Sequence, residues 1–161
     1  MIKIIGMCIV AVAIVFFGFS YSAKYSKRIK ILESMILFIE FAENQIRYLG
    51  SRVDNIIDDA IKSKNFNELF FLNDIKECEN YRFCTEYQES FPLSKLDFEH
   101  IYLFFDKLGF SDIEGEISHC ELYKSLINDD LLNAKSDYSN KGKLYKSMSV
   151  LIAIAVMIIF I

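Results

Sequence analysis

Residues 4–23 read IIGMCIVAVAIVFFGFSYSA, twenty positions without one charged side chain. As a helix that rises 1.5 Å per residue, this stretch is about 30 Å long, the thickness of the hydrocarbon core of a bilayer. Residues 147–161, SMSVLIAIAVMIIFI, form a second uncharged stretch of about 22 Å. The stems of the two lysines just before it can extend its apolar surface to the headgroups. We therefore expect transmembrane segments at 1–23 and 147–161, with one domain at 24–146 between them.

The charged side chains lie between these two stretches and are sorted by sign. Residues 33–137 hold 22 acidic and 10 basic side chains, a net charge of −12, in a chain whose overall net charge is −4. No basic surplus exists to replace the counterions of phosphates, so we expect no nucleic-acid binding. Basic side chains beside a transmembrane segment mark its cytoplasmic side and suit the anionic lipids there. The membrane-flanking basic residues are Lys24, Lys27, Arg28 and Lys30 after the first segment and Lys141, Lys143 and Lys146 before the second.

These two features predict a hairpin in the cell membrane whose middle domain faces the cytoplasm. The first segment could instead be a cleaved secretory signal, with Lys3 as its charged start and Ser20-Tyr21-Ser22 as a small-x-small cleavage site. The uncharged run is longer than the usual apolar region of a signal, about 7 to 15 residues. A retained transmembrane helix is therefore the preferred interpretation.

The four cysteines are expected to be reduced thiols, because disulfides are rare in the cytosol. Their spacing contains no Cys-x-x-Cys pair, and on a helix His119 points to a different face from Cys120. The sequence therefore predicts no metal site, and no part of it indicates a cofactor. The cysteines are Cys8, Cys78, Cys84 and Cys120.

Between the two ends, apolar residues recur at steps of three and four, the spacing of one helix face. No stretch alternates convincingly with period two, so no sheet is expected. We predict an all-α fold, an antiparallel helical bundle of five or six helices with N- and C-terminal membrane spans. The expected helices are 25–49 ending at Gly50, 53–61 broken at Lys64-Asn65, 66–75, one from an N-cap at Ser94 to Gly109, and one from a capping box at 111–114 that is interrupted at Gly142 before the second span.

The sequence shows no arrangement that points to catalysis. It contains no Gly-rich phosphate loop, no GxSxG and no HExxH. Acidic pairs among polar residues on the outer face of a helix are expected to be solvated, and histidines far apart on different helices to lie at the boundary of the core. We therefore expect no catalytic residue and no enzyme. The acidic pairs are Asp58-Asp59, Glu114/Glu116 and Asp129-Asp130, and the histidines are His100 and His119.

Three motifs along nearly the whole chain resemble the stage III sporulation protein AB family. Gly18-Phe19 and Ala23-Lys24-Tyr25, followed by a long helix ending in ENQIRY (43–48), are similar to the opening of the family. Residues 105–112, FDKLGFSD, resemble its LGxSD turn, and residues 143–148, KLYKSM, resemble its closing KLYRSLG segment.

The resemblance implies a membrane protein of the mother cell in an endospore-forming bacterium. Members are encoded beside a secretion-type ATPase and other channel components, and their fold is related to the type II secretion inner-membrane platform protein. By that analogy the chain is expected to be a non-catalytic platform or adaptor of the channel between mother cell and forespore, docking the ATPase and other stage III sporulation channel proteins. Similarity of fold alone does not establish this function.

Gly109, Ser111 and Asp112 are the candidate structural turn or partner surface, because they are expected to fix the turn between the last two helices of the domain. A different class of function remains open from the residues themselves. The chain could be a membrane-anchored regulator or small-ligand sensor with a helical cytoplasmic domain. That function would require a buried cavity with convergent polar groups.

Overall fold

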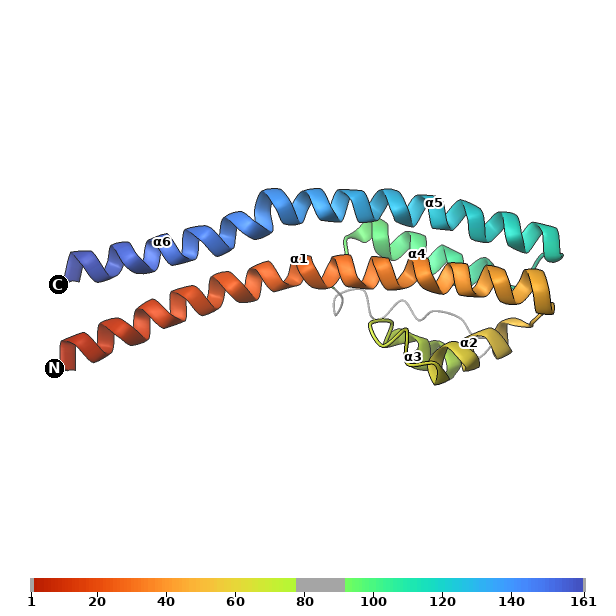
Figure 1. Cartoon of the computed structure of the whole chain (residues 1–161), viewed down its shortest axis with the longest axis horizontal. Helices are drawn as coiled ribbons and strands as arrows, with labels where there is room; N and C mark the ends of the chain where they lie inside the picture. The colour runs from red at the N-terminus through yellow and green to blue at the C-terminus, as the bar shows by residue number, and fades with distance from the viewer. Residues whose placement is uncertain (1, 78–91, 161) are drawn as a thin grey trace. The chain divides into compact units, whose positions relative to one another are not determined.

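The computed structural model describes residues 2–77 and 92–160, and Figure 1 traces them as a succession of helices. Residues 78–91, which include Cys78 and Cys84, lie outside the described residues. The chain divides into two compact units. We call Met1–Ile29 with Asn133–Ile161 the terminal unit, and Lys30–Leu132 the central unit.

The regular elements of the described residues are all helical, which confirms the predicted fold class. The last three elements follow one another without a break, so the described residues form five separate helical runs. The elements are α1 (Ile2–Leu49), α2 (Val53–Lys62), α3 (Phe71–Glu77), α4 (Lys95–Lys107), α5 (Ile113–Asp137), a π-helical segment (Tyr138–Gly142) and α6 (Lys143–Phe160).

Helix α1 is one continuous helix that joins the first apolar stretch to the helix expected at 25–49. It ends at Leu49 because Gly50 adopts φ +57°, a left-handed conformation that favours glycine. The N–H of Gly50 donates to the carbonyl of Ile46 at 3.1 Å, and the N–H of Ser51 donates to the carbonyl of Gln45 at 3.2 Å. These bonds satisfy two carbonyls of the last turn.

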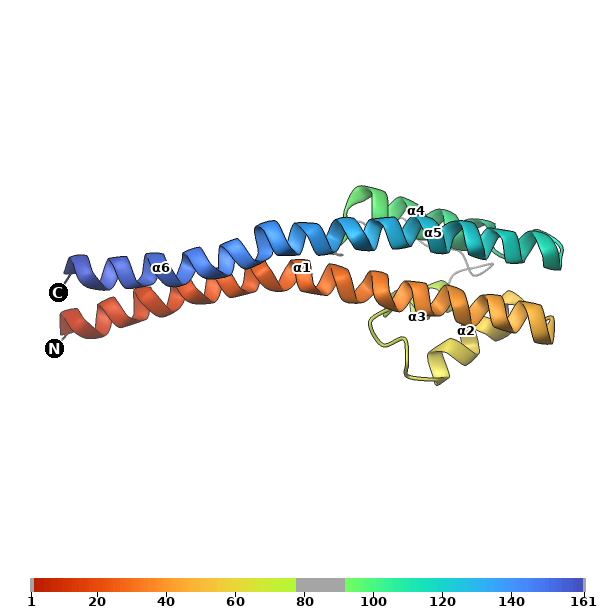
Figure 2. The ribbon, with the colours of Figure 1, turned by 45° about the horizontal axis from the view of Figure 1, so that its top comes forward.

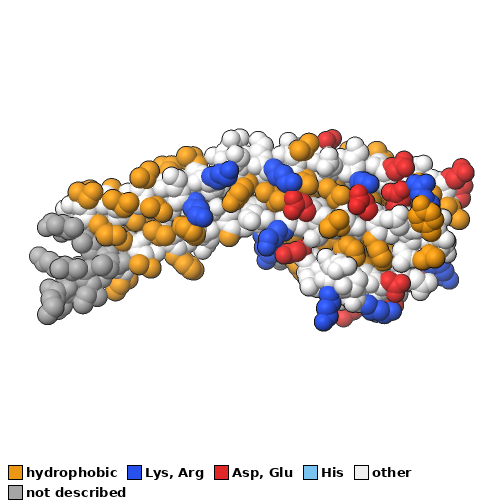
Figure 3. Space-filling view, in the orientation of Figure 1, with side chains coloured by type: hydrophobic (Ala, Val, Ile, Leu, Met, Phe, Trp, Pro, Cys, Tyr) orange, Lys and Arg blue, Asp and Glu red, His pale blue; other side chains and the backbone are white. Residues whose placement is uncertain are grey.

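Two candidate membrane spans lie within these long helical runs, at Ile9–Leu49 and Ile113–Ile159. Their most apolar windows are 11% and 17% buried, whereas the core helix of a soluble domain would be mostly covered. In the terminal unit Phe16 and Phe17 expose 70% and 75% of their surface, and Figure 3 shows hydrophobic side chains spread over this region. Exposed apolar surface of this extent is typical of contact with lipid, which supports membrane association.

Small side chains line the contact between α1 and α6 in the terminal unit. Ala11 and Ser22 on α1 and Ser149 and Ala153 on α6 are buried. Gly18 lies directly against Ser149, because a Cβ placed on Gly18 would overlap the Ser149 side chain. Small residues let two helix backbones approach closely, as they do in membrane helix pairs.

Helices α1 and α5 run antiparallel in the central unit, as both Figure 1 and Figure 2 show. Their core is aromatic: the ring of Phe38 on α1 lies 5.5 Å from Phe105 and 6.3 Å from Phe104, both on α4, and 5.7 Å from Phe66. The rings of Phe38 and Phe104 meet edge to face, a favourable arrangement of aromatic quadrupoles. The fully buried side chains include Ile31, Leu32, Met35, Phe38, Ile39, Ile56, Ile57, Leu69, Phe71, Leu72, Ile75 and Phe104.

The predicted helix at 66–75 begins five residues later than expected, at Phe71. Residues before it form turns, one of which is closed by the N–H of Leu69 donating to the carbonyl of Phe66 at 2.8 Å. Phe66, Leu69 and Phe71 are buried, whereas Phe70 is 44% exposed. The error has a physical cause, since a three-residue spacing of apolar side chains fits successive turns as well as a helix.

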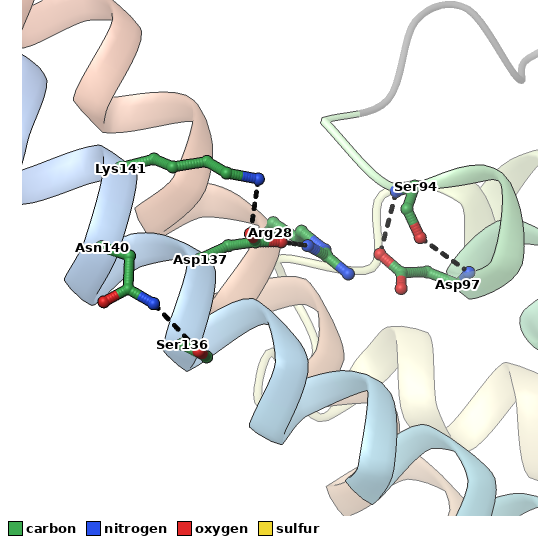
Figure 4. Close-up of polar contacts among 7 residues, drawn as sticks. All are labelled: Arg28, Ser94, Asp97, Ser136, Asp137, Asn140 and Lys141. Carbon is green, nitrogen blue, oxygen red and sulfur yellow. Dashed lines mark hydrogen bonds and ion pairs between the residues drawn. The ribbon is translucent and has the colours of Figure 1, made fainter.

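The N-cap predicted at Ser94 is confirmed, and it forms a full capping box, drawn in Figure 4. The Ser94 hydroxyl accepts from the N–H of Asp97 at 3.1 Å, and the Asp97 carboxylate accepts from the N–H of Ser94 at 2.9 Å. At the other end of the domain, the interruption predicted at Gly142 takes the form of a change in helix type, and the chain stays helical through it. A π-helical segment connects α5 to α6 there, and a Cβ on Gly142 would lie 2.7 Å from the ring of Tyr138.

Candidate partner-binding site at the turn between α4 and α5

Gly109 places the turn between α4 and α5 against the start of α2. Its φ of +91° is one that residues with a side chain rarely adopt. A Cβ on Gly109 would lie 2.6 Å from Cγ2 of Val53, the first residue of α2. Glycine is therefore required here both by the backbone conformation and by the close approach of α2.

Asp112 is the N-cap of α5, because its Oδ1 accepts from the N–H of Gly115 at 3.0 Å. The capping box expected at 111–114, with Ser111 as the cap, does not form. Ser111 lies one residue before this cap, and its N–H donates to the carboxylate of Glu116 at 2.8 Å. The three residues named from the sequence therefore do build this turn, with a different residue as the cap.

Glu116 is a residue of the site whose burial was not predicted from the sequence. It was expected to be solvated, but it is 5% exposed. Its Oε1 accepts from the N–H of Gly109 at 3.0 Å as well as from that of Ser111, so this side chain closes the turn. Its Oε2 is buried and has no hydrogen-bond partner among the residues that the structure describes.

A groove of about 560 Å³ opens at this turn. Four helix ends in the central unit meet there: the end of α1, the start of α2, the end of α4 and the start of α5. Phe110 and Ile113, which are 71% and 55% exposed, lie on its wall. The groove is lined by Ile46, Gly50, Ser51, Arg52, Val53, Asp54, Phe105, Leu108, Gly109, Phe110, Ser111, Ile113 and Glu116.

Glu116 determines the charge of the groove. The other two charged side chains on its lining, Arg52 and Asp54, lie 3.7 Å apart and offset each other. One carboxylate then remains without an opposite charge in the lining. The groove therefore combines apolar walls with a single uncompensated negative group, which suits binding of a cation attached to an apolar group.

Asp130 is a second acid whose expected solvation is wrong. It is 2% exposed, and its Oδ2 lies 2.6 Å from Nδ1 of His100. Asp129 is exposed, as expected. A sequence signal could have identified both buried acids, because Glu116 and Asp130 continue the helix face of the buried residues between them. That face runs through Glu116, Cys120, Tyr123, Ile127, Asp130 and Ala134, at steps of three and four.

His119 and Cys120 do not form a nucleophile pair. The His119 ring stacks on the ring of Phe104 at 5.3 Å, and Nε2 of His119 lies 3.1 Å from the carbonyl oxygen of Phe104. Cys120 is fully buried, and burial raises the pKa of its thiol to about 12, so the thiol is protonated at neutral pH. Within the ranges that the structure describes, no three His, Cys, Asp or Glu side chains gather as metal ligands would.

Two of the membrane-flanking basic residues in the terminal unit form a network with an acid, Asp137, which Figure 4 shows. Arg28 lies 2.9 Å from one oxygen of Asp137, and Lys141 lies 2.8 Å from the other. The hydrogen bond from Lys141 and that from Arg28 hold the pKa of the Asp137 carboxyl below its usual range. This network ties α1 to the last turn of α5.

The remaining flanking cations lie at the surface. Lys24 is placed over the ring of Tyr21 at 5.8 Å, and Lys146 over the ring of Phe19 at 4.6 Å, geometries that allow cation–π attraction. Lys30, in the central unit, lies 3.9 Å from Glu68. Lys27 and Lys143 are exposed.

These observations define an all-helical protein with two candidate membrane spans and a helical unit that carries a groove lined by apolar and charged side chains. The family model described as Stage III sporulation protein AB (spore_III_AB) matches residues 3–161, and the chain belongs to this family. Its role is therefore related to sporulation, in a family of structural or adaptor proteins that is not a known enzyme family. No curated protein and no solved structure matches the chain.

Proposed function

We propose that this chain is a non-catalytic membrane platform of the channel complex between mother cell and forespore, and that its central unit docks a cytoplasmic secretion-type ATPase. The observation that carries the proposal is the family match over residues 3–161, which includes both apolar ends as well as the helical unit between them. A platform needs both parts, because one anchors the chain and the other binds.

The charge distribution supports a cytoplasmic central unit in the mother-cell membrane. Basic residues flank both candidate spans on the side of the middle segment, as expected for a cytoplasmic domain. Arg28 from the first cluster and Lys141 from the second converge on Asp137, so the two clusters are linked within the terminal unit. A cytoplasmic location also agrees with a buried, protonated Cys120.

The geometry of the central unit favours binding of a protein over turnover of a substrate. Its groove lies at the end of four helices, has exposed apolar side chains on its wall and is open to solvent. A small-ligand sensor would hold its ligand among convergent polar groups in an enclosed cavity. The groove here is open, and apolar side chains lie in its lining beside the Arg52–Asp54 pair and the Glu116 carboxylate, so a protein segment fits it better than a small ligand does.

Retention of the ATPase on membranes tests the proposal. Membranes are prepared from sporulating cells that carry the wild-type chain or lack it, and the ATPase is quantified in each. We expect retention that depends on the chain, and loss of retention and of spore formation in Gly109→Val with the variant still inserted in the membrane. Equal ATPase on both membranes would refute the docking role.

Topology is a separate test of the same proposal. A single reactive cysteine is placed at the exposed position Ser118 and, in another variant, at the C-terminus, and intact cells are treated with a membrane-impermeant maleimide. We expect labelling at the C-terminus and protection at Ser118→Cys. Labelling of the central unit from outside would overturn the platform role, because an external domain cannot meet a cytoplasmic ATPase.

A further inference from the structure

We propose that the groove at the α4–α5 turn binds a basic and apolar segment of a partner protein, whose Lys or Arg head group pairs with the carboxylate of Glu116. The inference rests on the proposed docking function and specifies its site and chemistry. Three features of the central unit support it. Oε2 of Glu116 is buried and has no partner among the described residues, no cation of the described lining is paired with Glu116, and apolar side chains surround the opening.

The unpartnered oxygen is the first feature. Glu116 is 5% exposed, and two backbone N–H groups occupy its Oε1 while Oε2 has no partner. A buried carboxylate oxygen without a hydrogen bond is unfavourable, because it has lost its contact with water and gained no donor in exchange. A ligand that donates to this carboxylate makes the interaction that the free protein lacks.

The charge of the missing donor follows from the lining. Arg52 is committed to Asp54, and its side chain is 84% exposed. On the adjoining face of α1, Arg47 pairs with Glu43 at 2.7 Å and lies 3.7 Å from Glu121. Of the residues that the structure describes, Arg52 in the lining and Arg47 on α1 therefore both lie beside acids other than Glu116. A cationic donor from outside complements the groove, whereas a neutral donor would leave the charge of Glu116 uncompensated.

The walls define the rest of the occupant. Val53, Leu108, Phe110 and Ile113 surround the opening with apolar side chains, two of which are strongly exposed. A residue with an aliphatic stem and a charged tip, flanked by an apolar neighbour, covers these walls while its tip reaches Glu116. This chemistry identifies a protein segment that holds Lys or Arg next to a large apolar residue.

A pair of peptides tests the inference on the full-length chain in lipid nanodiscs. The probe is Ac-Leu-Arg-Leu-NH₂, and its matched control is the same peptide with neutral citrulline in place of Arg. Binding is followed by the NMR shifts of the isotope-labelled methyl groups of Ile113 and Val53. A charge-assisted hydrogen bond predicts that the Arg peptide binds at least about tenfold more tightly than the citrulline peptide.

Two variants assign the effect to the carboxylate. Glu116→Gln keeps an oxygen for the N–H groups of Gly109 and Ser111 but removes the charge, so the turn is retained, and circular dichroism and the thermal midpoint check this. We expect the preference for the Arg peptide to vanish in Glu116→Gln and to persist in Glu114→Gln, an exposed position on the same helix. Equal binding of the two peptides, absent binding, or a preference that survives in Glu116→Gln would overturn the inference.

The same variants separate this inference from the proposed function. If wild-type membranes retain the ATPase and Glu116→Gln membranes retain it equally, docking stands and the groove is not its contact. If wild-type membranes do not retain it, the docking role fails whatever the peptides show. Loss of retention in Glu116→Gln but not in Glu114→Gln supports both.

Discussion

Gly18 on α1 lies directly against Ser149 on α6, so close that a Cβ on Gly18 would overlap the Ser149 side chain. The position of this contact explains why the buried residues of the pairing are small: Ala11, Ser22 and Ala153 lie on the same two helices. Helices in lipid gain little from hydrophobic burial against each other, so close backbone approach is a main source of their attraction.

Gly18→Leu is therefore expected to separate α1 from α6. The larger side chain has no space at the contact, and overpacking of this kind costs about 1–3 kcal/mol. Gly6→Leu is the control, because nothing lies within 4 Å of a Cβ on Gly6. The measurement is the thermal midpoint of each purified variant in one detergent, and similar midpoints for the two leucine variants would contradict the close contact.

The contact between Gly109 and Val53 leads to a prediction about coupling. Gly109→Ala introduces both a strained φ and an overlap with Val53 Cγ2, whereas Gly50→Ala introduces strain with open space around it. We expect Gly109→Ala to lower the free energy of unfolding by at least about 1 kcal/mol more than Gly50→Ala.

A double-mutant cycle isolates the overlap from the strain. Val53→Ala removes Cγ2, so it is expected to destabilise the wild-type chain but to recover part of the stability of Gly109→Ala. Urea unfolding of the full-length chain in micelles, followed by far-UV circular dichroism, gives the four free energies. Strictly additive effects of the two substitutions would show that the turn does not press on α2.

The Asp137 network predicts a pH dependence of stability. Because Lys141 and Arg28 lower the pKa of Asp137 in the folded chain, the carboxylate stabilises the folded state at a pH above its ordinary unfolded value of about 3.9. This contribution is lost as the pH falls through the lower folded pKa. We expect the stability difference between wild type and Asp137→Asn to be constant from about pH 7 to 5 and to shrink below about pH 4.

The control for this profile is Asp129→Asn, which changes an exposed acid on the same helix. Its difference from wild type should stay within about 0.5 kcal/mol at every pH. A difference for Asp137→Asn that does not change with pH would show that the network leaves the titration of Asp137 unaltered.

Because Asp130 is buried against His100, replacing it is expected to lower the free energy of unfolding far more than replacing the adjacent Asp129. Asp130 is 2% exposed and lies 2.6 Å from His100, so Asp130→Ala removes a buried charge-assisted contact and is expected to cost roughly 2–3 kcal/mol. Asp129→Ala is expected to cost less than about 0.5 kcal/mol. Equal unfolding free energies for the two alanine variants would contradict the burial of this pair.

The elements that the sequence predicted well are those with local causes. Gly50 ends α1 through its own backbone conformation, and Ser94 caps α4 through bonds to residues within one turn. The helix at 66–75 was placed too early because local spacing alone does not distinguish turns from a helix. Its start at Phe71 depends on which aromatic side chains the core accepts, and Phe71 enters that core beside Phe105, at 6.0 Å.

For the candidate site, the sequence identified the turn at Gly109, Ser111 and Asp112 but not the side chain that holds it. Glu116 was grouped with solvated acids, although it lies on the same helix face as Cys120. An acid on that face is buried only if the opposite surface offers donors for it. In this fold the donors are backbone N–H groups of the turn itself.

The sequence by itself determined the helical class, the two apolar ends, the sign of the charges beside them and the residues at which most helices end, because each depends on composition or on neighbours within a turn. The tertiary structure alone decided that Gly18 meets Ser149, that Gly109 meets Val53 and that Glu116 and Asp130 are buried. The reason is physical: burial of a carboxylate and close approach of two backbones depend on groups far apart in the chain, which only the folded state brings together.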